Sequence, residues 1–154
     1  MHRVHAIGLA SLCCAIVAVV AACGSSSQVQ YNYGSLANEI CGKFTATTTS
    51  NPSTAARLRA LDAALAGLQG LNPPKTVQTM FLDLIYHFKA AIDILKPNMQ
   101  TLSRLGAYLQ AHPGDKRSTR QYARITRRIQ RHLQVAARDA HILALSRCET
   151  VFGG

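Results

Sequence analysis

The sequence predicts an all-α protein, an up-and-down helical bundle of about four main helices with a terminal disulfide, preceded by a cleaved signal peptide. Three observations support this prediction. The chain of 154 residues is rich in the helix formers Ala, Leu, Gln and Arg and contains no Trp. Apolar residues recur at spacings of three and four along most of residues 35–154, as on one face of a helix. The turns between these segments are short, which places successive helices antiparallel in a bundle.

Residues 1–22 have the layout of a secretory signal peptide. A short start with the basic Arg3 is followed, from Ala6 to Ala22, by an apolar run without charge. This run is at the lower end of the length that spans a hydrocarbon core of about 30 Å, and no basic stop-transfer cluster follows it. We therefore predict that residues 1–22 are cleaved after export by the general secretion route, and that they do not stay as a membrane anchor.

The end of this leader, Val20-Ala21-Ala22-Cys23, resembles the lipobox of bacterial lipoproteins. The resemblance implies a diacylglycerol on the thiol of Cys23, cleavage just before this residue, and attachment to the extracytoplasmic face of the cell membrane. Two or more fatty chains give a stable anchor, at about 0.8 kcal/mol per buried CH₂. Residues 23–34 begin with small polar side chains and are predicted to form a lipidated flexible tether. Residues 35–154 are then the helical bundle domain.

The first two helices are predicted from apolar spacing and from a proline. Residues 36–47 have Cys41 and Phe44 on one side of a helix. Asn51-Pro52 is a helix-start signal, with proline at the first helical position, and the second helix runs from there to about Gln69.

The most apolar helix is predicted over residues 75–96. Its broad apolar face consists of Val77, Met80, Phe81, Leu84, Ile85, Phe88, Ile92 and Leu95. Pro97 is expected to interrupt it, because proline has no N–H for the helical hydrogen bond, so residues 99–111 form a separate shorter helix. After a turn at residues 112–115, a last long helix is predicted over residues 118–148.

The cysteines divide according to the predicted processing. Cys13 and Cys14 leave with the signal peptide, and Cys23 takes the lipid. Cys41 and Cys148 remain, near the two ends of the mature domain, in a compartment where disulfides persist. Two free buried thiols or a metal pair are the alternatives, but the chain has no CxxC spacing and no paired histidines of the kind that zinc sites use. We predict a disulfide, which would close a loop worth roughly 4–5 kcal/mol in the chain-entropy model.

Several loose motifs together resemble the small helical lipoproteins of actinobacteria. Besides the lipobox, they are the Cys41-Gly42 pair, the Leu-x-x-Leu-x-Pro-Pro segment at residues 68–74, the Gly114-Asp115 turn and the terminal Cys148. The resemblance covers most of the chain and implies a lipid anchor and a helical fold. That group is largely without assigned function, and its members are often less basic than this chain, whose net charge is +10 at pH 7.

The basic excess is concentrated at the start of the last predicted helix. Between Lys116 and Arg131 there are seven basic residues and no acidic one. At 100° per residue, six arginines of this segment share one side of the helix, and apolar residues occupy the other. We call these six residues the arginine stripe: Arg117, Arg120, Arg124, Arg127, Arg128 and Arg131.

The arginine stripe has two interpretations. It can be a solvated face that keeps the protein soluble, or it can be an anion-binding surface. Like charges at these spacings cost a few tenths of a kcal/mol per pair, and the planar guanidinium suits bidentate contacts with phosphate or carboxylate. The partners predicted for such a surface are anionic lipid headgroups, an acidic envelope polymer or an acidic protein. Nucleic acid is disfavoured by the compartment, although the stripe alone does not exclude it.

No motif of a known catalytic class is present: the sequence has no GxSxG, no P-loop, no HExxH and no SxxK. Asp83 and His87 lie one helical turn apart, a spacing that is common by chance, and no cofactor is predicted. The chain is therefore predicted to be a non-catalytic binding or structural module. The alternative is a carrier of a hydrophobic or lipid ligand in an inter-helix cavity lined by residues 75–96, although plain core packing also explains that apolar face.

Overall fold

The computed structural model describes residues 32–50 and 53–153, and every regular element in these ranges is a helix. The predicted signal peptide, the predicted lipidation site Cys23 and most of the predicted tether lie outside the described residues. Within the described ranges, no helix has the length and apolar character needed to cross a membrane.

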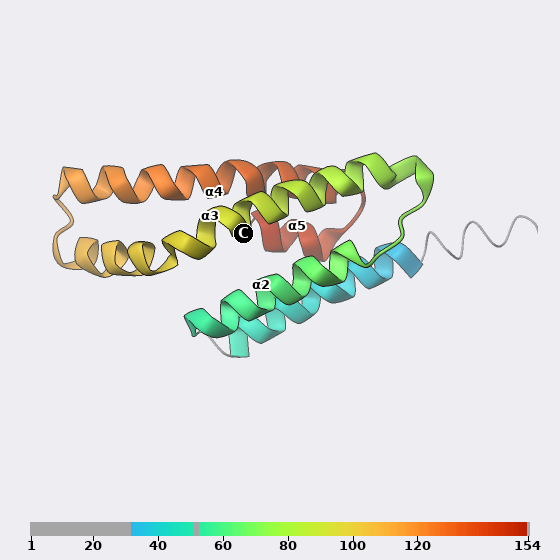
Figure 1. The fold of residues 1–154 in the computed structure, drawn as a ribbon, viewed down its shortest axis with the longest axis horizontal. Coiled ribbons are helices and arrows are strands. Elements are labelled where there is room, and N and C mark those ends of the chain that lie inside the picture. Colours follow the sequence, from blue (N-terminus) through green and yellow to red (C-terminus); the bar gives the residue numbers. More distant parts are fainter. Residues whose placement is uncertain (1–31, 51–52, 154) are drawn as a thin grey trace, which may run out of the picture.

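The described residues form five helices in succession (Figure 1). An N-terminal helix occupies residues 32–50. It is followed by α2 (Thr54–Gln69), α3 (Lys75–Ala111), α4 (Lys116–Ile142) and the short α5 (Ser146–Gly153). The all-helical prediction is confirmed. In Figure 1 the N-terminal helix and α2 form one antiparallel pair, α3 and α4 form a second, and α5 turns back beside the end of α4.

The core lies at one end of the α3–α4 pair. Every fully buried side chain of α3 falls between Phe81 and Ile92, and those of α4 fall between Ile129 and Ala140. Two ring contacts join this core to other elements: Tyr33 of the N-terminal helix packs on Phe81 at 4.9 Å between ring centroids, and Phe152 of α5 packs on Phe88 at 4.7 Å.

Beyond the core, α3 and α4 continue as a two-helix arm, which we define as residues 97–128. None of the side chains in this arm is fully buried. In Figure 1 the arm extends away from α5 on the side where the α3–α4 turn lies. The arm carries most of the arginine stripe, so the fold presents these side chains on a projection instead of over the packed core.

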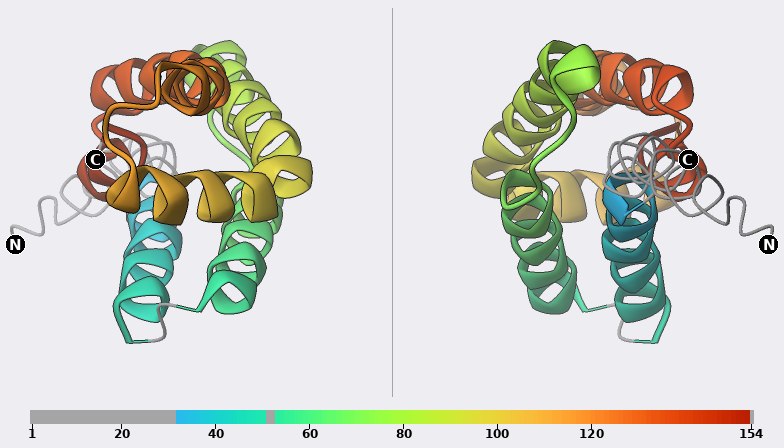
Figure 2. Two further views of the ribbon diagram at one scale, coloured as in Figure 1. Left: turned by 90° about the vertical axis from the view of Figure 1, so that its left-hand side faces the viewer. Right: turned by 90° about the vertical axis from the view of Figure 1, so that its right-hand side faces the viewer.

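Pro97 does not end the third helix as predicted. α3 continues through it to Ala111, and the two halves of α3 run in different directions (Figure 2), as is usual for a helix with an internal proline. Next to the proline, Nδ2 of Asn98 donates to the carbonyl oxygen of Ile94 at 2.8 Å.

The prediction of one long helix over residues 118–148 was also wrong. α4 ends at Ile142, and Cys148 belongs to the separate α5. The chain reverses at Ala144, whose φ of 55° is in the left-handed region. The N–H of Leu145 donates to the carbonyl of Ala140 at 2.8 Å, and the N–H of Ala144 donates to that of His141 at 3.0 Å. These two bonds form a Schellman motif. The sequence did not predict it, because the left-handed position is an alanine instead of the usual glycine.

The boundaries near the start of the domain also differ from the prediction. The last three residues of the predicted tether, 32–34, are helical, and Tyr33 is buried in the core. The second helix begins at Thr54, with Ser53 as its N-cap, instead of at Pro52; the Ser53 Oγ accepts a hydrogen bond from the N–H of Ala56. The tether is therefore shorter than residues 23–34, because the aromatic ring at residue 33 gains more from burial than a linker residue would.

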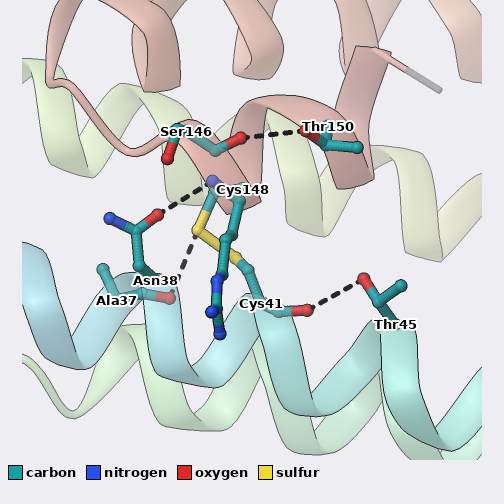
Figure 3. Close-up of a disulfide and its surroundings, with 8 residues drawn as sticks. Ala37, Asn38, Cys41, Thr45, Ser146, Cys148 and Thr150 are labelled. Carbon is teal, nitrogen blue, oxygen red and sulfur yellow. Dashed lines mark hydrogen bonds between the residues drawn. A yellow bond between two sulfur atoms is a disulfide. The ribbon is translucent and has the colours of Figure 1, made fainter.

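The predicted disulfide is confirmed. Cys41 of the N-terminal helix is bonded to Cys148 of α5 across 107 positions, and both residues are fully buried (Figure 3). The same contact is supported by Asn38, whose Oδ1 accepts the N–H of Arg147 at 2.9 Å in the first turn of α5. The Arg147 side chain covers Gly42, where an added Cβ would lie 2.6 Å from the guanidinium Nη1. The two ends of the domain are thus joined by a covalent bond and by polar contacts.

The turn at Ala144 gives a testable prediction about stability. An alanine in the left-handed region costs roughly 1–2 kcal/mol relative to its preferred conformations, whereas glycine has no such cost. Part of this gain is lost because glycine makes the unfolded chain more flexible. We expect Ala144→Gly to raise the free energy of unfolding by about 0.5–1 kcal/mol in urea denaturation. Ala111→Gly, at the exposed last residue of α3, is the control and should not be stabilising.

Candidate anion-binding site

Asp115 starts the helix that carries the arginine stripe. Its Oδ1 accepts the N–H of Arg117 at 3.0 Å, and its Oδ2 accepts the hydroxyl of Ser118 at 2.7 Å. The Ser118 hydrogen bond, followed by that from Arg117, lowers the pKa of this carboxyl below its ordinary value. The charged cap therefore stabilises α4 at neutral pH, and its contribution is lost as the pH falls through that lowered pKa.

All six side chains of the arginine stripe are exposed. The Nε of Arg120 and that of Arg127 each donate to a backbone carbonyl of their own helix, four residues earlier, at 3.1 Å. Five of the six arginines line one open hollow of about 270 Å³ on this face. These five are Arg120, Arg124, Arg127, Arg128 and Arg131. The sixth, Arg117, is not among the residues that line it and lies nearer the start of α4.

Beyond Arg117, no acidic side chain neutralises the arginine stripe. The chain has seven acidic residues, and each of them is engaged elsewhere in the described ranges. Four are paired with Lys43, Lys89, Lys96 or Arg138. Two face histidines, and the last is the Asp115 cap. Asp115 interacts with Arg117 at the start of the stripe, but Arg120, Arg124, Arg127, Arg128 and Arg131 have no acidic partner among the described residues. Their guanidinium groups repel one another, and an external anion would relieve this repulsion.

Next to the arginine stripe, the fold places two histidines in contact that the sequence did not connect. Nδ1 of His87 on α3 lies 3.0 Å from Nδ1 of His132 on α4. The other ring nitrogen of His87, Nε2, lies 3.7 Å from Asp83 Oδ1. The spacing of Asp83 and His87 was visible in the sequence. The approach of His132 depends on how α3 and α4 are aligned, for which the sequence carries no signal.

These histidines line a second open hollow between α3 and α4, of about 580 Å³. Its lining consists of His87 and Ile94 from α3 and of Arg128, Arg131, His132, Gln134, Val135 and Arg138 from α4. We call it the histidine–arginine pocket. It shares Arg128 and Arg131 with the first hollow, so the two form one continuous basic surface. Among the described residues, no group of three or more His, Cys, Asp or Glu side chains is arranged to hold a metal ion.

Arg138, at the edge of this pocket, also supports a buried carboxylate. Asp139 is 1% exposed, and its Oδ1 accepts hydrogen bonds from Arg138 Nε and Nη2 at 3.0 and 2.8 Å. Its Oδ2 is buried and has no hydrogen-bond partner among the described residues. One exposed guanidinium thus provides the only charge-assisted hydrogen bonds that this carboxylate makes within those residues.

A further hollow is an apolar groove of about 1030 Å³ between the two helix pairs. Its apolar lining includes Phe44, Leu61, Leu95, Met99, Leu102 and Tyr122, and Thr48, Thr49, Arg57 and Gln110 are among its polar residues. Of residues 75–96, Phe88 and Leu95 line this groove, while most of that apolar face fills the core. The part of α3 beyond Pro97 contributes more of the lining than any other helix.

Compared with protein-family models, with curated proteins and with solved structures, the chain matches none. The function is therefore argued from the site itself.

The Arg138–Asp139 contact gives a prediction about stability. Arg138→Met removes both hydrogen bonds from a carboxylate that stays buried, and hydrogen bonds to charged groups contribute about 1.5–3 kcal/mol. We expect the free energy of unfolding in urea at pH 7 to fall by roughly 2–3 kcal/mol. Arg128→Met, an exposed change on the same helix without an acidic partner, should change it by less than about 0.5 kcal/mol. Equal effects of the two variants would contradict this account of Asp139.

Proposed function

We propose that this protein is a cell-envelope lipoprotein, held on the extracytoplasmic face of the cell membrane by lipid on Cys23, whose helical domain binds anionic phospholipid headgroups through the arginine stripe. The domain is a non-catalytic module, an up-and-down bundle of about four main helices like those of the small actinobacterial lipoproteins that the sequence resembles. The observation that supports this function most directly is a set of six exposed arginines on one helix face, of which only Arg117 has an acidic side chain beside it among the described residues.

The arm explains why the stripe favours a flat charged surface as its partner. The arginines extend along one side of α4 over more than three helical turns, and most of them lie on the arm away from the core. A basic residue close to an anionic membrane contributes roughly 1 kcal/mol, and this attraction decays within a Debye length. Lipid on Cys23 would keep the domain near such a surface, so even weak attraction would orient the arm toward the headgroups.

Vesicle co-sedimentation tests this function. We expect the unlipidated protein, residues 24–154, to bind vesicles that contain phosphatidylglycerol and not vesicles of phosphatidylcholine alone, and to dissociate as the salt concentration rises. The variant with Arg124, Arg127, Arg128 and Arg131 changed to Gln should bind at least about tenfold more weakly, since each 1.4 kcal/mol corresponds to a factor of ten.

A matched control distinguishes the effect of the arginine stripe on vesicle binding from the effect of net charge. Changing Arg57, Arg59, Lys75 and Arg104 to Gln removes the same charge from exposed positions outside α4 and should leave vesicle binding within about twofold of the parent protein. If both variants lose binding equally, net charge and not the stripe is responsible. If the parent protein does not bind anionic vesicles at low salt, the proposal is wrong, and an acidic polymer or protein becomes the partner to test.

The apolar groove supports a second candidate function, carriage of a hydrophobic or lipid ligand. Its volume of about 1030 Å³ is at the upper end of the range for small-molecule sites, and its mixture of apolar walls with a few polar groups is typical of them. The groove is an open hollow between helices that core packing has not filled.

Displacement of a fluorescent apolar probe tests the carrier function. A fatty acid should displace the probe from the parent protein. Ala107→Trp, which places an indole in the groove, should weaken probe binding by about tenfold or more, because a bulky side chain occupies the space that the ligand needs. Ala111→Trp, one turn further along α3 and outside the lining, is the control. Unchanged probe binding in Ala107→Trp would exclude the groove as the site.

A further inference from the structure

The histidine–arginine pocket combines two features that the arginine stripe alone does not have: a concave shape between two helices and a pair of titratable rings in contact. Its walls come from α3 and α4 only. Two apolar side chains, Ile94 and Val135, line it together with three arginines and the two histidines. The side chain of His87 is 21% exposed, so its ring is largely shielded from solvent.

The contact between the two Nδ1 atoms restricts the protonation states of the pair. At 3.0 Å the two nitrogens form a hydrogen bond, so one Nδ1 must carry a hydrogen and the other must not. If His87 directs its Nε2–H toward Asp83, its Nδ1 is the acceptor and His132 Nδ1–H is the donor. His132 Nε2 is then unprotonated. A proton added there gives a cation that keeps the contact, whereas a second added proton would break it.

The charged groups around the two histidines affect whether the pair holds that added proton. Asp83 favours the positive charge, and Arg128, Arg131 and Arg138 disfavour it. Tyr86 presents its ring to His87 at 5.2 Å between ring centroids, and Arg138 is already paired with the buried Asp139. The guanidinium groups of Arg128 and Arg131 have no acidic partner among the described residues, and an anion held by them would favour a positive charge on the histidine pair. Anion binding and proton uptake therefore favour each other, which is thermodynamic coupling between two sites.

The charges around the two histidines also determine which kind of ligand the pocket can bind. Two histidines in contact could suggest a metal site, but three guanidinium groups around them repel a metal cation. Arginine forks suit the oxygens of a tetrahedral dianion, and a protonated imidazole adds a further donor. The hollow of about 580 Å³ is larger than a bare phosphate needs, and its apolar wall leaves space for an ester group.

We propose that the histidine–arginine pocket binds a phosphate-class dianion, such as a phosphate monoester, and takes up one proton on the His87–His132 pair as it does so. This inference rests on the proposed function in one respect, that the basic face of α4 binds anions. It adds a defined pocket, a ligand class and a proton to that function. The pocket would bind its ligand more tightly in acidic surroundings than in neutral ones.

Calorimetry with sulfate tests the coupling, because sulfate stays a dianion between pH 5.5 and 8, the range in which histidine titrates. The full chain is studied in a non-ionic detergent at constant ionic strength set with chloride. We expect sulfate affinity to rise as the pH falls, by up to about tenfold per pH unit when each bound anion brings one proton. Titrations in buffers with different ionisation enthalpies should report about one proton taken up.

Two histidine variants locate the proton. His132→Gln keeps a polar side chain but cannot titrate, so sulfate should still bind while the pH dependence and the proton uptake disappear. His141→Gln changes an exposed histidine that pairs with Glu149 outside the pocket and should behave as the parent protein does. If His132→Gln does not fold, His132→Asn tests the same prediction. The proposal fails if sulfate binds no better than chloride, or if the pH dependence survives in the His132 variant that folds.

A third variant separates this inference from the proposed membrane function. Changing Arg120, Arg124 and Arg127 to Gln alters the stripe outside the pocket. It should weaken vesicle binding and leave pH-dependent sulfate binding within about twofold. Loss of sulfate coupling in this variant would overturn the assignment to the pocket.

The source of the anion is distinguished by two ligands in the same detergent. Glycerol phosphate in solution and phosphatidic acid in the micelles both carry a phosphate monoester. A response to both identifies a pocket for free dianions, and a response to phosphatidic acid alone identifies a lipid headgroup site. A response to neither contradicts the proposal.

Discussion

The turn at residues 143–145 determines how the rest of the domain is assembled. It ends α4 with a left-handed alanine and directs α5 back against the core. Only with this reversal does Cys148 meet Cys41 and Phe152 meet Phe88. The two bonds of the Schellman motif satisfy carbonyls at the end of α4 and so offset part of the strain at Ala144. A helix that continued straight through this point would carry Cys148 beyond the N-terminal helix.

The disulfide and α5 join the two ends of the domain beside one end of the α3–α4 pair. Packing is therefore unequal along that pair. The covalent link, the aromatic contacts and the buried side chains are all near α5, and the arm beyond Pro97 and before Ile129 has no fully buried residue. The kink and the reduced packing leave the apolar groove open between the arm and the first helix pair. The apolar groove and most of the arginine stripe therefore lie where packing is weakest. The buried core near α5, at the other end of the α3–α4 pair, supplies the stability.

Charge is distributed in a similar way. The acidic side chains form pairs mostly on the first helix pair and on the core portions of α3 and α4, whereas the stripe from Arg120 to Arg131 has no acidic partner among the described residues. Arg138, on the same helix but outside the stripe, uses its guanidinium to hold Asp139 at the boundary between core and basic face. This residue links stability to the pocket, since it supports a buried carboxylate and also lines the space where the histidines meet.

The sequence by itself determined the helical class, the disulfide partners and the side of α4 on which the arginines lie. Each of these depends on local periodicity or on a count of residues, so no knowledge of packing was needed. It did not determine that α3 continues through Pro97, that α4 stops before Cys148, or that residues 32–34 are helical. The last two outcomes depend on a left-handed alanine and on the burial of Tyr33. Only the tertiary structure decided that His132 meets His87 and that the groove lies beyond Pro97, because both depend on how two helices are aligned, and helical periodicity within each sequence segment contains no information about that alignment.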